Sequence, residues 1–231
     1  MNQLIKYIAL TAASLLFLAP VSLAQKTPYT GTIVYDVKPG QDLPEITKSM
    51  APKMMTYKFS NDKQSMKLSF PMMDQITIYD PATKVARILM DLFGQKIVVN
   101  QSAAEIEELR KQQGETKGIK ETNETKTIAG YPCKKTVITR KTDEGKEIAS
   151  TIYYTDAIDV SKFSLFSAFP EIKGLPLEFS MKMGQMDFLV TARSVTKENI
   201  PPSEFVVGSD YRQVTVEELK KLFGNSAFPV K

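Results

Sequence analysis

Residues 133–154 read CKKTVITRKTDEGKEIASTIYY and predict a β-hairpin. Two runs rich in β-branched and aromatic residues, Cys133 to Lys141 and Glu147 to Tyr154, flank the turn sequence Asp143-Glu144-Gly145. Apolar and polar side chains alternate along the second run, as they do on a strand that buries one face. Because the connection is short, the two strands must pair in the antiparallel sense.

The same alternation extends this hairpin into a sheet of many strands. We expect further strands at residues 31–38, 56–60, 65–70, 75–79, 84–91, 96–100, 175–183 and 186–197. Short turns separate most of them, and in Asp80-Pro81-Ala82-Thr83 the proline occupies the position that a type I turn favours. Residues 115–126 are polar and fit either a solvated edge strand or a loop. The pattern therefore predicts an antiparallel meander within an α+β domain dominated by one large curved sheet.

Short helices are expected between these strands. Ser102-Ala103-Ala104-Glu105 and Thr215-Val216-Glu217-Glu218 are capping boxes that each begin a helix. Asp42 is expected to cap an earlier helix whose apolar stripe contains Ile46 and Met50. Each of these helices has an apolar stripe on one side, so each is expected to pack on the sheet.

The N-terminus has the features of a secretory signal peptide over residues 1–24. Lys6 is followed by an apolar run over residues 7–18, and Ser22-Leu23-Ala24 is a small-x-small cleavage signal. We therefore expect a single domain over residues 25–231 that is periplasmic or secreted. The sequence has no second long apolar run, so no transmembrane anchor is expected.

Cysteine and histidine usage excludes several classes of protein. Cys133 is the only cysteine, so the chain is expected neither to be a lipoprotein anchored through its N-terminus nor to form an internal disulfide. A buried thiol is the expected state of this residue. The chain has no histidine, which excludes Ser-His-Asp and Cys-His nucleophile systems and an ordinary zinc site. The net charge is +4, and acidic residues are interspersed with the basic ones along the chain. No block of basic residues could follow a nucleic-acid backbone, so no nucleic-acid partner is expected.

Phenylalanine and methionine provide the candidate ligand-binding residues. A short helix over residues 158–169 would align three phenylalanine rings, and the strand at 175–183 would direct five apolar side chains to one face, Phe179, Met181 and Met183 among them. Two further methionines follow Pro71 in a loop, where they could form a gate or a contact patch. The candidates are Phe163, Phe166, Phe169, Phe179, Met181, Met183, Met72 and Met73.

Each of these patterns also has a structural explanation. Methionine commonly fills gaps in a core, and a phenylalanine stripe can simply dock a helix. Met181-x-Met183-x-x-Met186 is compatible with a thioether Cu(I) site, but the absence of histidine favours a core role, so no metal and no cofactor are expected.

Several motifs resemble an uncharacterised domain family of exported bacterial proteins. These are IAGYPCKK at 128–135, IYYTD at 152–156, IKGLPLEF at 172–179 and PSEF at 202–205. That family is similar to the lipoprotein-carrier fold of LolA and LolB. The resemblance implies an unclosed, strongly curved half-barrel with short helices packed over its concave face. It also implies that acyl chains could be shielded between the sheet and the helices.

Two functional hypotheses follow, and neither involves catalysis. The first is an exported carrier or binding protein for a hydrophobic ligand such as a lipid or an acyl chain. The second is a structural or protein-interaction module of the cell envelope, with a filled core and a protein partner. A hydrolase that uses carboxylates alone is the weakest alternative, because it would need two carboxylates that converge in one cleft.

Overall fold

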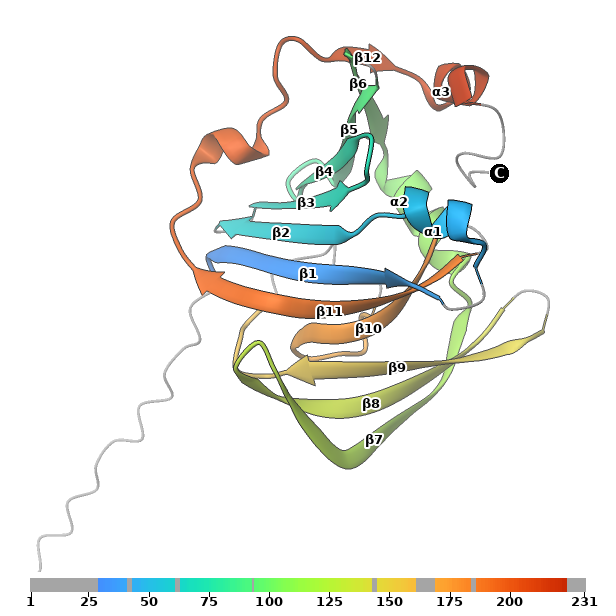
Figure 1. Ribbon diagram of the computed structural model, residues 1–231, viewed down its shortest axis with the longest axis vertical. Helices are drawn as coiled ribbons and strands as arrows, with labels where there is room; N and C mark the ends of the chain where they lie inside the picture. Colours follow the sequence, from blue (N-terminus) through green and yellow to red (C-terminus); the bar gives the residue numbers. More distant parts are fainter. Residues whose placement is uncertain are drawn as a thin grey trace, which may run out of the picture.

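The computed structural model describes residues 29–40, 43–60, 63–92, 94–142, 145–160, 169–183 and 186–223 (Figure 1). The strands are β1 (Gly31–Pro39), β2 (Met54–Ser60), β3 (Lys63–Ser69), β4 (Asp74–Asp80), β5 (Val85–Leu92), β6 (Gln95–Gln101), β7 (Glu115–Ile128), β8 (Tyr131–Lys141), β9 (Glu147–Thr155), β10 (Leu175–Met183), β11 (Met186–Lys197) and β12 (Arg212–Val214). The helices are α1 (Glu45–Met50), α2 (Ala103–Lys111), α3 (Val216–Phe223) and the short 3-10 helix η2 (Pro202–Phe205).

Within this part of the chain, twelve strands form a single sheet in the order β12-β6-β5-β4-β3-β2-β1-β11-β10-β9-β8-β7. Neighbouring strands are antiparallel except for β12, which runs parallel to β6. β12 and β7 form the two edges, so the sheet is curved but not closed (Figure 1). The predicted α+β fold, an unclosed antiparallel half-barrel with a few short helices, is confirmed.

The first strand lies in the middle of the sheet rather than at an edge. β1 pairs with β2 on one side and with β11 on the other, so Gly31 lies opposite both Phe59 and Lys197. One meander, β2 to β6, extends from β1 in one direction. The second meander, β11 back to β7, extends in the other.

The hairpin predicted at residues 133–154 is confirmed. Lys141 pairs with Glu147 and Lys134 pairs with Tyr154, which places β8 and β9 in the expected register. The polar segment that fitted either a strand or a loop is the edge strand β7. Its pairing with β8 is irregular between Glu121 and Thr125, and such irregularities are common where a strand has no outer neighbour.

Both predicted capping boxes are present. The Ser102 hydroxyl accepts a hydrogen bond from the Glu105 amide at 3.3 Å, and the Glu105 carboxylate accepts from the Ser102 amide at 2.7 Å. Thr215 and Glu218 make the same exchange at the start of α3. The expected cap of α1 was wrong, because this helix begins at Glu45 after Pro44 and has no side-chain cap. Pro44 is itself the N-cap, with an extended ψ of 146°, and its ring has no oxygen that could accept from the first helical amides.

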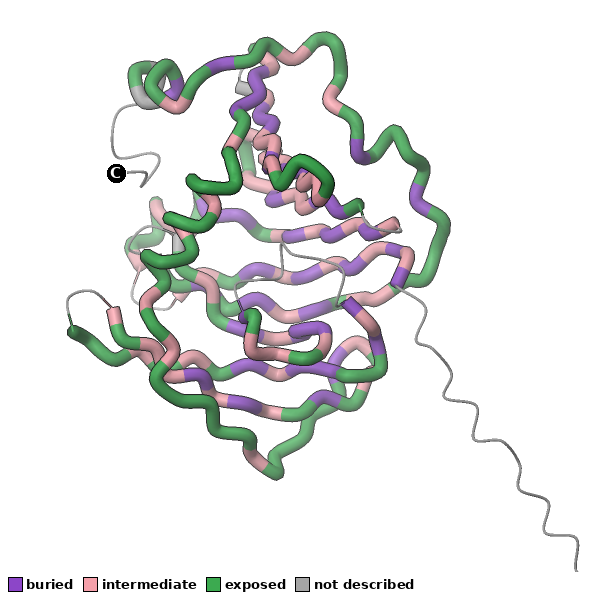
Figure 2. Tube along the Cα trace, turned by 180° about the vertical axis from the view of Figure 1, so that it is seen from behind, coloured by how far each residue is buried: buried purple, intermediate pink, exposed green. Residues whose placement is uncertain are grey.

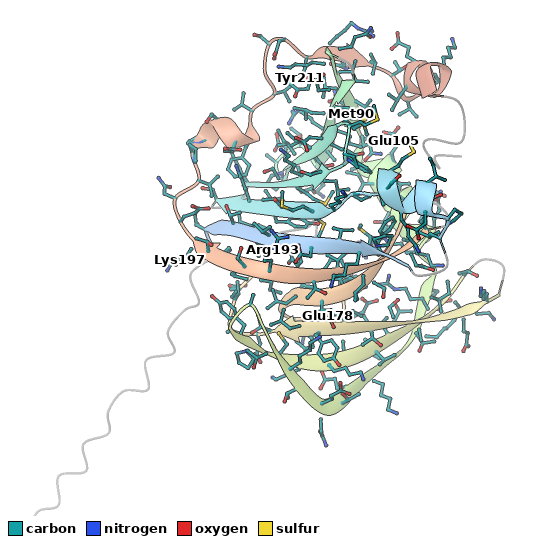
Figure 3. The ribbon with its side chains drawn as sticks, viewed as in Figure 1. Met90, Glu105, Glu178, Arg193, Lys197 and Tyr211 are labelled. Carbon is teal, nitrogen blue, oxygen red and sulfur yellow. The ribbon has the colours of Figure 1, made fainter. Side chains whose placement is uncertain are left out.

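The central core lies on one face of the sheet, which we call the inner face and define by Ile33, Tyr35 and Val37 of β1. The opposite, outer face is polar around β1, β10 and β11. There Arg193 pairs with Asp36, and Lys126 pairs with Glu178 at 2.8 Å; Arg193 and Glu178 are labelled in Figure 3. Along β1, buried residues accordingly alternate with residues that are mostly of intermediate burial (Figure 2).

The expectation that only one face of every strand is apolar was wrong for β4, β5 and β6. Residues 198–214, here called the C-terminal strap, cross the outer face of these strands and bury Ile200 and Phe205 against Leu89. Lys58 pairs with Glu204 of the strap at 2.8 Å. Consecutive residues of β6, from Ile97 to Val99, are therefore buried on both faces.

The thiol of Cys133 is buried, as predicted. It lies 3.4 Å from the carbonyl oxygen of Tyr131, to which it donates, and burial raises its pKa. None of the described helices is long and apolar enough to cross a membrane. The expected leader, residues 1–24, lies outside the described residues.

Candidate apolar site on the inner face

A continuous row of aromatic rings crosses the inner face of the sheet. Tyr57 stacks on Phe59 with ring centres 5.7 Å apart, and the edge of Tyr35 meets Tyr57 at 6.1 Å. On the other side, Tyr35 meets Phe179 at 6.0 Å. Phe179 in turn meets Phe169 at 5.5 Å. We call these five residues the aromatic row.

The row crosses β11 because that strand has a small residue at the crossing point. Ala192 is the β11 residue opposite Tyr35, and its methyl group leaves the ring of Tyr35 room to reach Phe179 on β10. The Tyr35 hydroxyl also extends to β10, where it donates to the carbonyl oxygen of Pro176 at 2.9 Å. The pairing of β9 with β10 shifts its register between Pro176 and Glu178.

Burial keeps the tyrosines of the row neutral. It raises the pKa of the Tyr35 and Tyr57 hydroxyls well above the ordinary value for tyrosine, because a phenolate in this environment would lose its hydration. The bond from Tyr35 to Pro176 satisfies a buried hydroxyl. The row is therefore an uncharged surface that suits an apolar group rather than an ion.

Two described segments between β9 and β10, residues 156–160 and 169–174, lie over this face, and together we call them the cover chain. They contain bends and turns but no helix or strand. Ile158, Val160 and Phe169 belong to the same cluster of buried residues as the aromatic row. By contrast, neither α1 nor α2 has a fully buried residue. Within the described residues, the inner face near the row is thus covered by irregular chain more than by helices.

An ion pair holds the C-terminal part of the cover chain against the sheet. Glu171 accepts from the Arg140 guanidinium at 3.2 Å and from the Thr116 hydroxyl. The Arg140 guanidinium also lies 5.6 Å from the centre of the Phe169 ring. Burial opposes ionisation of Glu171, but the hydrogen bonds from Thr116 and the charge of Arg140 outweigh it and lower the pKa of this carboxyl.

A polar cavity of ≈ 550 Å³ lies beside this ion pair, between α2 and the adjoining ends of β7 and β8. It is lined by charged and polar residues of both signs: Glu107, Glu108, Arg110, Lys111, Gln113, Gly114, Glu115, Thr116, Arg140, Pro170 and Glu171. Because charged groups line the cavity, it does not suit an apolar ligand. The cavity is therefore a different site from the aromatic row.

The structure brings some of the predicted ligand residues together and separates others. Phe169 and Phe179 are buried and in contact, and Met181 packs against the same cluster. Met183 ends β10, but its side chain is not among those described, and Phe163 and Phe166 lie outside the described residues. Met72 and Met73 lie in the turn between β3 and β4, and neither joins a core cluster.

Sequence reasoning missed three rings of the row: Tyr35, Tyr57 and Phe59. All three were visible as apolar residues on alternating strands, but alternation predicts which face is buried and not which residues touch across strands. A second signal was available, because aromatic residues at positions two apart in one strand share a face. In β2 that spacing relates Tyr57 to Phe59.

Within the described residues, no group of three or more His, Cys, Asp or Glu side chains gathers as a metal site would require. Of the methionines considered for Cu(I), Met181 and Met186 are partly buried against the central cluster. That packing accounts for both thioethers without a metal ion.

Comparisons with known proteins establish no family for this chain. No protein-family model matches the chain, and no curated protein matches its sequence. Among solved structures, the crystal structure of LprF from Mycobacterium bovis is similar over 74% of this chain and 89% of that chain, with a TM-score of 0.34 and 11% identity. The family resemblance drawn from the sequence motifs stays a prediction.

Proposed function

We propose that this protein is an exported, non-enzymatic binding protein that holds an apolar ligand, such as an acyl chain, against the inner face of its half-barrel. The observation that carries the proposal is the composition of the aromatic row. Four of its rings belong to the sheet, whereas the ring at its end, Phe169, belongs to the cover chain. Movement of the cover chain would therefore expose Phe179, an apolar side chain of β10 that a ligand could contact.

The exchange of cover for ligand is energetically reasonable. Burial of a phenylalanine side chain stabilises a protein by roughly 1.5–3 kcal/mol, and a ligand that takes the place of Phe169 would bury the same surface of Phe179. Only the contacts of the cover chain must be broken, and the strands beneath it keep their ladder. The ion pair between Arg140 and Glu171 then limits how readily the cover moves.

The first experiment asks whether a ligand is present and whether it binds at the row. Protein purified from the exported fraction is extracted with organic solvent for mass spectrometry, and delipidated protein is titrated with a fluorescent fatty acid. We expect Phe169→Ala to bind the probe several-fold more tightly than the wild type, because the ligand no longer competes with a ring.

Phe205→Ala is the matched control. Phe205 is buried to a similar extent, but it lies in the C-terminal strap on the outer face. Its loss should lower stability and leave probe binding unchanged. The proposal fails if no lipid is extracted and the wild type does not bind the probe, or if the two alanine variants bind it equally.

A second candidate function is a protein-interaction module with a permanently filled core. The dense packing of the inner face favours it, since Tyr35, Phe59 and Phe188 are almost completely buried. This candidate predicts a dry interior and no extractable lipid. The extraction and the titration described above therefore decide between the two functions.

A further inference from the structure

We propose that one end of the half-barrel docks onto the surface of an anionic phospholipid membrane. Five residues define this docking end: Lys38, Ile46, Met50, Lys53 and Met72. The inference goes beyond the proposed function and does not depend on it, because a protein with a filled core could dock in the same way.

The apolar part of the docking end is highly exposed. Ile46, Met50 and Met72 are 73%, 63% and 73% exposed, and they make up half of the large apolar side chains that are exposed in the described part of the chain. Ile46 and Met50 are four residues apart on α1 and so share one side of the helix. A six-residue helix gains stability mainly from the burial of such a stripe, yet nothing in α1 is buried. The apolar stripe of α1 is therefore available to bind the surface of another molecule or of a membrane.

The backbone places these residues at the same end of the sheet. The Val37 amide donates to the Lys53 carbonyl oxygen at 3.0 Å, and the Lys53 amide donates to the Ser69 carbonyl oxygen at 3.0 Å. The end of β1, the start of β2 and the end of β3 are thus adjacent. α1 lies beside the end of β1 and the start of β2 (Figure 1), and the turn that carries Met72 follows directly from β3.

Positive charge accompanies the apolar side chains. Lys38 and Lys53 are exposed, and neither pairs with a carboxylate among the described residues. The nearby carboxylates of Glu45 and Asp74 do have partners, Lys48 at 2.8 Å and Lys67 at 2.6 Å. Two lysines therefore stay available beside three exposed apolar groups.

This combination suits a lipid bilayer better than a protein groove. Apolar side chains enter the boundary between headgroups and acyl chains, while lysines attract anionic headgroups. The three apolar side chains project from a helix and a separate turn at one end. A planar surface can receive such separate contacts together without being shaped to fit them.

The test uses protein whose intact mass shows that the leader has been removed, because an uncleaved leader would itself bind lipid. The protein is sedimented with vesicles of phosphatidylglycerol and phosphatidylcholine, and separately with vesicles of phosphatidylcholine alone. We expect binding to the anionic vesicles that weakens as salt is added. The variant Ile46→Ser/Met50→Ser/Met72→Ser should lower the vesicle partition coefficient by about tenfold or more.

Two further variants separate the components. Lys38→Glu/Lys53→Glu should weaken binding to anionic vesicles and leave the weak binding to phosphatidylcholine unchanged. Ile119→Ser/Val206→Ser is the matched control, since these residues are 51% and 63% exposed but are not part of the docking end. It should bind as the wild type does.

Docking is disproved if the folded wild type ignores anionic vesicles, or if the triple serine variant binds them as well as the wild type. Binding of the wild type to a purified envelope protein in place of vesicles would also count against a membrane. Fatty-acid titration of the same variants without vesicles should be unaffected. A wild type that binds the fatty acid but not the anionic vesicles would thus overturn docking alone and leave the proposed function standing.

Discussion

Glu171→Gln gives the sharpest prediction about how the cover chain is held. The substitution keeps the size of the side chain and removes its charge. It leaves Arg140 beside a neutral group at a site where the two side chains are only 14% and 13% exposed. The loss of one partner costs about 3–5 kcal/mol when a pair is fully buried and about 0–1 kcal/mol when it is exposed.

The position of this pair between those limits gives the expected magnitude. Arg140 keeps other contacts after the change, among them a hydrogen bond to Gln113 and its contact with the Phe169 ring. We therefore expect Glu171→Gln to lower the free energy of unfolding by about 2 kcal/mol. For a chain of this size, the melting temperature should fall by roughly 4–8 °C.

The pH dependence provides an independent check of the same contact. The folded state lowers the pKa of Glu171. Its charged form therefore contributes stability above the pKa of an unfolded glutamate, about 4.3, and that contribution is lost as the pH falls through the folded value. The difference in stability between wild type and variant should be full at neutral pH and should shrink below about pH 4.

Urea unfolding followed by circular dichroism, repeated at several pH values, measures both effects. Glu45→Gln is the control, because Glu45 also pairs with a lysine but is 89% exposed, so its loss should cost less than about 0.5 kcal/mol. A Glu171→Gln variant as stable as Glu45→Gln at neutral pH would refute the argument. So would a difference that does not depend on pH.

Three further predictions test other contacts. Ser102→Ala should lower stability by about 1 kcal/mol in urea unfolding, because it removes the cap of α2; an unchanged midpoint would contradict this. Gly174→Ala should cost roughly 1–3 kcal/mol, since its Cβ would lie 2.4 Å from the Thr155 carbonyl oxygen, whereas Gly118→Ala, with nothing within 4 Å, should be neutral. Cys133 should react with a thiol reagent only as fast as the protein opens, and rapid labelling of the native protein would show that the burial is wrong.

Local patterns in the sequence predicted the secondary structure well. The β-branched and aromatic residues of 133–141 and 147–154, with the turn between them, predicted the β8–β9 hairpin, and the capping boxes at Ser102 and Thr215 predicted the starts of two helices. Both signals act over a few residues, so one sequence contains them in full. The N-cap of α1 was predicted wrongly. The side chain of Asp42 suits a helix cap, but the helix begins later, directly after Pro44.

Long-range pairing was harder to predict. Nothing in the alternation of β1 indicates that its second partner is β11, nor that the C-terminal strap covers the outer face of β4 to β6. The candidate site had the same difficulty. Phe179 was found because it alternates within one strand, whereas its contact with Tyr35 depends on the small residue Ala192 in the strand between them.

The central position of β1 has a consequence for the order in which the chain folds. β1 is synthesised before both of its partners, and it can pair with β2 as soon as a short connection has followed it. Its other edge must wait for β11, whose Lys197 lies opposite Gly31. Such distant pairing slows folding, and until it forms the chain presents an open, apolar strand edge that can aggregate. The two halves of the sheet can therefore join only after β11 has been made, and a chaperone that protects this edge would raise the yield of native protein.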